Sequence, residues 1–193
     1  MFNKYNPSKL IVLLGAMCFS ASAVGAYSQP DGFSSWRSDE LGITLNYPLN
    51  WKVDEKPETV DVPCLLEADV TIGLDDPDQA DPFGAFVMPV FIGEGYFEDI
   101  TTLADVWRQN SKRDWVEFEI ISQGEVATAE GHPGYELRYA VTDEMDYRIQ
   151  WSVWLVLTKE KKRAWVLGYC ARDAFNTYYQ DARNIFGLAE FDD

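Results

Sequence analysis

The stretch DYRIQWSVWLVLTKEKKRAWVLGYCAR, residues 146–172, carries the strongest structural signal in this sequence. Apolar side chains fill one face of its first half at every second position: Tyr147, Ile149, Trp151, Val153, Leu155 and Leu157. Such alternation is typical of a β-strand. The charged run KEKKR, residues 159–163, predicts a turn, and residues 164–170 form a second apolar run that leads back. The stretch therefore predicts a long β-hairpin.

The segments before this hairpin predict further strands and one helix. Apolar residues recur in strand-like runs at 43–47, 64–74, 86–92, 118–130 and 134–142. Pro89 places the third run at a sheet edge or a bulge, because proline cannot donate a ladder hydrogen bond. Residues 99–114 change to helical spacing, with Thr102 and Asp105 in the positions of a capping box.

A second helix is expected near the end of the sequence. Its apolar stripe consists of Phe175, Tyr178, Tyr179, Ala182, Ile185 and Phe186. Asp173 is placed to cap its start and Gly187 to end it. Strands followed by a helix, more strands and a final helix indicate an α+β domain, in which helices pack on an antiparallel sheet.

The first 26 residues have the order of a secretory signal peptide: lysines, then an apolar run, then small residues. Cleavage fits after Ala23 or Ala26, whereas lipidation at Cys18, the alternative, conflicts with the Met directly before it. No other stretch reaches about 18 apolar residues, so no stable membrane insertion is expected after signal removal. We expect a signal peptide at 1–26, a linker at 27–38 and one folded domain at 39–190. The expected location is the periplasm or an equivalent lumen.

The sequence is strongly acidic. It has 32 Asp and Glu against 16 Lys and Arg, and loss of two lysines with the signal peptide takes the net charge from −16 to −18. Such a surface repels nucleic acid and anionic lipid, and it favours cations or basic partners unless the acidity only maintains solubility. Two cysteines remain, Cys64 and Cys170, which either form one disulfide in an oxidising compartment or stay as buried thiols.

The sequence lacks the residues that common catalytic motifs require. The one histidine, His132, stands in EGHPGYE, where the flanking Gly and Pro predict a turn at a strand entry. There is no nucleophile elbow, Walker loop or dinucleotide-binding glycine motif, and the mature chain has too few Cys and His for a structural zinc site. The many carboxylates leave a hydrolase as an alternative, but their spacing selects no pair. We expect no catalytic residue, and no cofactor other than calcium.

The acidic loop DDPDQADPFG, residues 75–84, is the candidate calcium site. Asp76, Asp78 and Asp81 supply the hard oxygen ligands that suit calcium, although Ala80 and Asp81 break the helix–loop–helix calcium pattern. A solvated hairpin turn is the alternative interpretation. KEKKR also has two interpretations: a charged turn that keeps the hairpin soluble, or a docking site for an acidic partner.

The stretch GITLNYPLNWKVDE, residues 42–55, alternates at Ile43, Leu45 and Tyr47 and is then interrupted by Pro48. Trp51 follows three residues later. This pattern predicts a corner, where the first strand leaves its sheet and the indole of Trp51 covers the edge of the core.

Four segments together carry a family resemblance: YPLNW (47–51), EGHPGYELRY (130–139), RIQWSVWLVLTKEKKRAWVLGYCA (148–171) and FNTYYQDARNIFGLAEF (175–191). They resemble the PsbP-like superfamily, which includes PsbP, bacterial periplasmic DcrB-type proteins and the eukaryotic Ran-release factor. In that family a strand ends in Tyr-Pro near a Trp, a Gly-x-Pro motif opens a later strand, and a helix follows the last hairpin. The resemblance spans about residues 38–190. It implies an α/β/α sandwich around a central antiparallel sheet of about six strands.

The resemblance also implies a non-catalytic binding or assembly module. We therefore expect an exported module, not an enzyme, that binds a protein partner in the periplasm. The alternatives are an extrinsic photosystem II accessory protein in the thylakoid lumen and a carboxylate-dependent hydrolase. The leader argues against the role of the Ran-release factor, and the single histidine argues against the ion sites that some photosystem members use.

Overall fold

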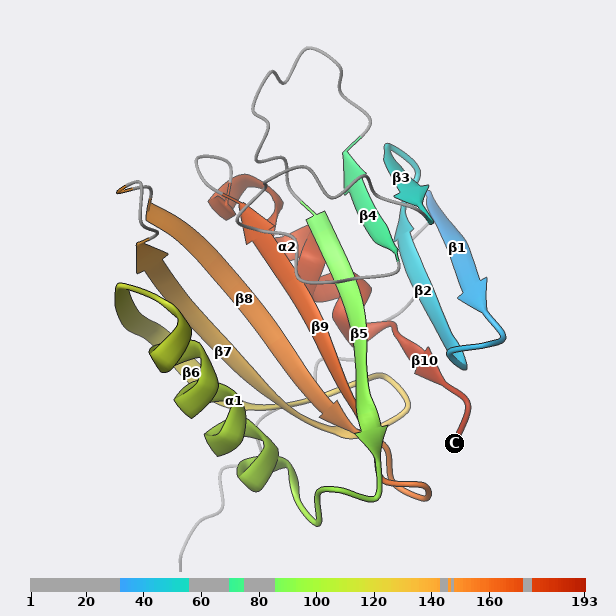
Figure 1. Cartoon of the computed structure of the whole chain (residues 1–193). Coiled ribbons are helices and arrows are strands. Elements are labelled where there is room, and N and C mark those ends of the chain that lie inside the picture. Colours follow the sequence, from blue (N-terminus) through green and yellow to red (C-terminus); the bar gives the residue numbers. More distant parts are fainter. Residues whose placement is uncertain (1–31, 56–69, 75–85, 143–145, 147, 172–174) are drawn as a thin grey trace, which may run out of the picture.

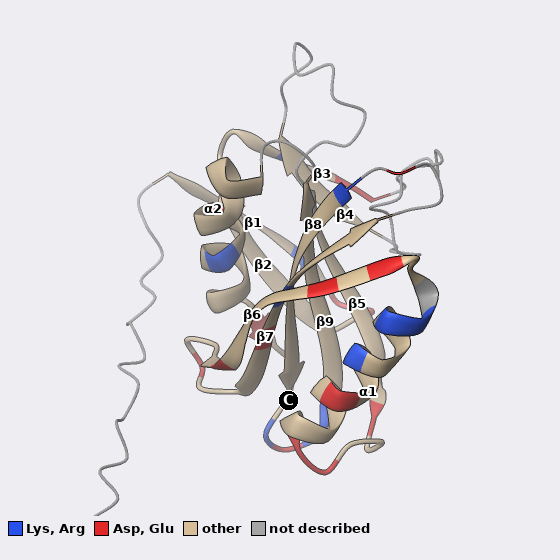
Figure 2. Ribbon diagram, turned by 90° about the vertical axis from the view of Figure 1, so that its left-hand side faces the viewer, with Lys and Arg blue, Asp and Glu red and all other residues tan. Residues whose placement is uncertain are grey.

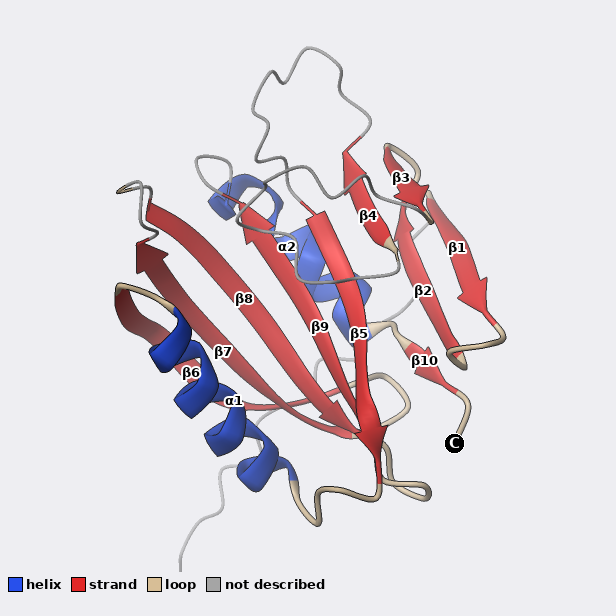
Figure 3. Cartoon of the chain, in the orientation of Figure 1, coloured by secondary structure: helices blue, strands red, loops and turns tan. Residues whose placement is uncertain are grey.

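The computed structural model describes residues 32–55, 70–74, 86–142, 146, 148–171 and 175–193. Within these residues, seven antiparallel strands form one sheet, and a smaller sheet of three strands lies beside it (Figure 1). One helix packs on each face of the large sheet, as Figure 3 shows by colour. The predicted α+β fold with a central antiparallel sheet is confirmed, although the sheets hold more strands than the six expected.

The elements follow one another as β1 (Phe33–Ser38), β2 (Ile43–Pro48), β3 (Trp51–Asp54), β4 (Thr71–Leu74), β5 (Phe86–Glu94), α1 (Ile100–Asp114), β6 (Glu117–Ala127), β7 (Pro133–Thr142), β8 (Arg148–Leu157), β9 (Arg163–Ala171), α2 (Phe175–Gly187) and β10 (Glu190–Phe191). The large sheet has the order β3-β4-β5-β9-β8-β7-β6, and the small sheet has the order β1-β2-β10. All of these strand pairs are antiparallel.

The predicted hairpin is confirmed as β8 and β9, which lie near the middle of the large sheet. Alternate residues of β8, from Ile149 to Leu157, face α1 and form the α1-side core with Leu103, Leu137 and Tyr139. Trp154 and Val156 face the other way and join the α2-side core with Ile43, Leu45, Trp165 and Phe186. Because a helix covers each face, both sides of these two strands are buried, which explains their nearly continuous apolar sequence.

The predicted corner at Pro48 and Trp51 is also confirmed. β2 ends at Pro48 in the small sheet, and β3 begins at Trp51 in the large sheet. The Trp51 side chain is only 2% exposed and meets the ring of Tyr178 on α2 edge to face, with centroids 6.3 Å apart. The indole therefore seals the α2-side core at the point where the chain passes from one sheet to the other.

The segment expected as a linker contains a strand. Residues 33–38 form β1, which pairs with β2 so that Trp36 lies opposite Leu45. The described part of the fold therefore already includes residues 33–38, ahead of residue 39. The β1 sequence, FSSWRS, has no clear apolar alternation, because β1 is at the edge of the small sheet and buries only part of its surface.

The two helices lie close to their predicted positions, but the cap of α1 differs. Asp99 is the N-cap, and its carboxylate accepts hydrogen bonds from the Thr102 backbone N–H (2.8 Å) and hydroxyl (3.0 Å). The predicted cap residue, Thr102, is thus the donor and not the acceptor. These bonds lower the pKa of Asp99. The predicted cap of α2, Asp173, lies outside the described residues.

A β-bulge lets β6 contribute side chains to both cores. The register with β7 shifts between Ile120 and Ser122, so Ile121 is an extra residue. Phe118, before the shift, packs against the α1-side core, whereas Val126, after it, packs against the α2-side core. An unbroken strand would present both side chains to the same face, because positions 118 and 126 differ by an even number.

Candidate functional site

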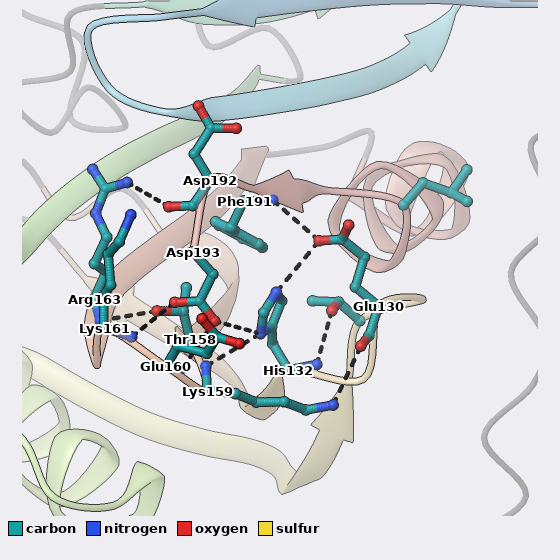
Figure 4. Close-up of polar contacts among 12 residues, drawn as sticks. Glu130, His132, Thr158, Lys159, Glu160, Lys161, Arg163, Phe191, Asp192 and Asp193 are labelled. Atoms are coloured by element: carbon teal, nitrogen blue, oxygen red, sulfur yellow. Dashed lines mark hydrogen bonds and ion pairs between the residues drawn. The ribbon is translucent and has the colours of Figure 1, made fainter.

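The structure brings His132 next to the KEKKR turn, two features that are 27 residues apart in sequence (Figure 4). The backbone N–H of Lys159 donates to Nδ1 of His132 at 3.3 Å, so the proton of the neutral ring lies on Nε2. Nε2 lies 3.3 Å from the carboxylate of Glu130, and the ring meets Phe191 of β10 edge to face. His132 is 6% exposed. Both ring nitrogens are therefore committed to contacts that hold loops together.

Asp193 holds the same turn from the other side. Its carboxylate accepts hydrogen bonds from the backbone N–H groups of Glu160 and Lys161, each at 2.9 Å, and Oδ2 lies 3.9 Å from Nδ1 of His132 (Figure 4). Burial opposes the charged carboxylate. The hydrogen bonds outweigh it and lower the pKa of Asp193 to about 2.

The lowered pKa of Asp193 predicts a pH-dependent contribution to stability. Because the folded-state pKa is below the ordinary value of 3.8, this contribution is complete above about pH 4 and is lost as the pH falls towards 2. We expect Asp193→Asn to lower the free energy of unfolding by about 1 kcal/mol at neutral pH, since solvent screens part of the interaction. Urea unfolding at pH 7 and pH 2.5 checks this. An equal loss at both pH values would contradict the assignment.

Two of the four cationic side chains of the KEKKR turn make contacts within the molecule. Lys159 donates through Nζ to the Glu130 backbone carbonyl at 3.4 Å. Arg163 donates to the carbonyls of Leu41 (2.7 Å) and Asp192 (3.0 Å), and its guanidinium lies over the ring of Phe91. The arrangement favours the structural interpretation of this turn over a docking site.

A polar cluster that sequence reasoning missed lies under α2. Glu136 of β7, whose side chain is 13% exposed, accepts hydrogen bonds from the hydroxyls of Tyr179 (2.6 Å) and Ser152 (3.1 Å), and Arg183 lies 3.7 Å away. The guanidinium of Arg138 stacks on the Tyr179 ring at 4.2 Å. Burial, followed by the Glu136 bond, raises the pKa of Tyr179. Glu136 and Arg138 are two positions apart and therefore lie on the same face of β7. The sequence does not show which residues of α2 contact them.

Among the described residues, no strand pairs with the outer edge of β6, one of the two end strands of the large sheet. β6 ends the strand order, and it is 11 residues long. Near its bulge Ile120 and Ile121 are exposed, at 38% and 44%. Glu117, Glu119 and Glu125 are exposed along the same strand, and Figure 2 shows acidic residues recurring there. A strand of this length offers a row of backbone hydrogen-bonding groups to another chain.

The candidate calcium ligands Asp76, Asp78 and Asp81 lie outside the described residues, so calcium stays a prediction. Among the described side chains, no group of three or more His, Cys, Asp or Glu is placed to hold a metal ion. Cys170 is buried in β9 and is disulfide-bonded. Its partner lies outside the described residues, as does Cys64, so a Cys64–Cys170 bridge stays one of the alternatives that the sequence leaves open.

Solved structures show the same fold. PsbP (CyanoP) from Synechocystis sp. PCC 6803 matches with a TM-score of 0.52 and 16% identity, over 90% of this chain and 98% of that one. LpqN from Mycobacterium tuberculosis, described as involved in cell envelope biogenesis, matches with 0.58 and 14%, over 83% and 91%. The Saccharomyces cerevisiae Ran-binding protein Mog1p matches with 0.57 and 9%, over 85% and 96%. The predicted resemblance to the PsbP-like superfamily is thus confirmed for the fold.

No protein-family model matches the sequence, and no curated protein matches it. Neither of the described helices is long and apolar enough to cross a membrane.

Proposed function

We propose that this protein is an extracytoplasmic, non-catalytic binding module, and that its protein partner adds a strand to the outer edge of β6. The outer edge of β6, with which no described strand pairs, is the observation that carries the proposal. The secretory character of residues 1–26 supports export, and the name of the LpqN neighbour, which refers to the cell envelope, is consistent with it. The Ran-binding description of Mog1p supports protein recognition by this fold.

The composition of β6 favours pairing with a different chain over pairing with itself. In a pair of identical β6 strands, Glu117, Glu119 and Glu125 would bring like charges together, which destabilises cross-strand pairs. The bulge at Ile121 further disturbs a flat self-pairing edge. A basic extended segment avoids the like-charge repulsion, since its charge complements the strand and the net charge of −16.

Ile121 is the residue whose substitution tests this surface most cleanly. It is the extra residue of the bulge and is 44% exposed, so Ile121→Glu removes an apolar contact without emptying a core position. We expect about tenfold weaker binding of the partner, as is typical for a residue near the centre of an interface. The partner is identified by capture on the immobilised full chain, and its affinity is then measured with the purified protein.

Leu49→Glu is the matched control, because Leu49 is 69% exposed in the turn between β2 and β3, away from β6 in the strand order. It should leave partner affinity unchanged. A partner that binds the Ile121→Glu variant as tightly as the wild type would refute the β6 surface.

A further inference from the structure

The strand register assigns each residue of β6 to one face of the large sheet. On β7, Tyr139 and Val141 belong to the α1-side core, so Ala140 and Thr142 lie on the opposite face, the α2-side face. Residues that lie opposite one another on neighbouring strands point to the same face of the sheet. The faces of β6 therefore follow from its partners on β7.

The first part of β6 places its acidic side chains on the α2-side face. Glu117 lies opposite Thr142 and Glu119 lies opposite Ala140. Glu117 accepts a hydrogen bond from the Thr142 hydroxyl at 3.0 Å, and Glu119 lies 2.6 Å from Arg148 of β8. The Glu119 side chain is still 64% exposed in this ion pair. Because Arg148 offsets only one of these two carboxylates, the pair leaves a negative charge beside the strand edge.

The same part of β6 places apolar side chains on the α1-side face. Phe118 lies opposite Val141, and Ile120 lies opposite Tyr139. Phe118 packs on the Tyr139 ring, with centroids 5.0 Å apart, whereas Ile120 is 38% exposed. Ile121, the extra residue of the bulge, follows it and is 44% exposed. These isoleucines present apolar surface that an added strand can cover.

The bulge ends this separation of acidic and apolar side chains. Beyond it, Glu125 lies opposite Tyr135, which packs against the α1-side core. The acidic residue after the bulge therefore lies on the other face from Glu117 and Glu119. Residues 117–121 are thus the part of β6 in which one face is acidic and the other is apolar.

We propose that the partner segment that adds to residues 117–121 alternates basic and apolar residues, with the basic side chains on the α2-side face. This inference rests on the proposed strand addition at β6. An added strand continues both faces of the sheet, so lysine or arginine at every second position meets Glu117 and Glu119, and the apolar residues between them cover Ile120. The partner is an extended amphipathic segment, and positive charge alone does not suffice.

The test compares two heptapeptides of identical composition, KVKVKVK and KKVVVKK, both with blocked ends. In an extended strand the first peptide places all its lysines on one face, whereas the second divides them between both faces. Because their net charges are equal, general attraction to the acidic protein contributes equally to both. Fluorescence anisotropy of dye-labelled peptides titrated with the full chain should show KVKVKVK binding on the order of tenfold tighter.

Charge reversal on the α2-side face should remove this preference. Glu117→Lys/Glu119→Lys repels the lysine face of KVKVKVK, so the two peptides should bind with similar affinity. Glu125→Lys/Glu190→Lys is the matched control, because it changes the net charge equally at exposed positions, one beyond the bulge on the other face and one on β10. It should weaken both peptides to a similar degree and keep their ratio.

Each outcome decides the proposal. Loss of the preference in Glu117→Lys/Glu119→Lys alone supports it. Equal binding of both peptides by the wild type, no saturable binding of either, or a preference that survives in Glu117→Lys/Glu119→Lys would overturn it.

The variant Ile121→Glu separates a failure of this inference from a failure of the proposed function. If the two peptides bind equally and Ile121→Glu weakens both, strand addition at β6 stands and the alternation is refuted. If Ile121→Glu leaves the binding of both peptides unchanged, the peptides bind elsewhere and the β6 surface itself is refuted.

Discussion

Replacing Trp51 by alanine should lower the free energy of unfolding by about 3–5 kcal/mol, the range measured for truncating a buried Trp or Phe. Trp51 is 2% exposed, packs against Tyr178 and lies where the chain crosses from the small sheet to the large one. The truncation would leave a void that both sheets border. Urea unfolding followed by far-UV circular dichroism measures the effect.

Leu49→Ala provides the control for Trp51→Ala, because Leu49 belongs to the same corner but is 69% exposed. Its midpoint should stay within experimental error of the wild type. If Trp51→Ala unfolded at the wild-type urea concentration and instead lost partner binding, the corner would be a binding platform and its role in the core would be refuted.

Reduction of the disulfide at Cys170 should have a comparable effect. If the partner is Cys64, the bridge closes a loop of more than 100 residues, and the chain-entropy model assigns it roughly 4–5 kcal/mol. Mass spectrometry of the unfolded protein should show a gain of two hydrogens on reduction. Urea unfolding with and without reductant should show the corresponding loss of stability.

The double variant Cys64→Ser/Cys170→Ser separates the bridge from side effects of the reductant. It should match the reduced wild type in stability and should not respond to reductant. A wild-type protein whose mass and unfolding midpoint are unchanged by reductant would show that both cysteines are free thiols in solution.

The parts of the fold that could be predicted from sequence are those where burial imposes a regular pattern. The strict alternation of β8 follows from a core on each side, and Pro48 marks a strand end because it has no N–H to donate. β1 escaped prediction because an edge strand with three serines needs little apolar surface. The bulge at Ile121 escaped prediction because a change in the phase of alternation within a strand resembles the end of one strand.

The candidate surfaces were harder to predict, because they depend on which elements become neighbours. His132 was expected in a turn at a strand entry, and it stands directly before β7. Its contacts with Lys159 and Asp193 arise only when the β8–β9 turn and the segment after β10 meet beside it. The pocket between α1 and the large sheet likewise combines residues of α1, β7 and β8 with Trp115, which follows α1. No local spacing in the sequence encodes such a meeting of distant segments.

The pairing of β10 with β2 also constrains the order in which this chain can fold. It joins Phe191 to Ile43 and Glu190 to Thr44, so the small sheet is completed by residues from opposite ends of the domain. Contacts this distant in sequence are slow to form, because much loop-closure entropy is lost before they contribute. A chain that emerges gradually from a ribosome or a translocon therefore keeps this side of the α2-side core open until residues 190–191 arrive. This uncovered side of the α2-side core would be the binding site for molecular chaperones, because it is the last part of the fold to close.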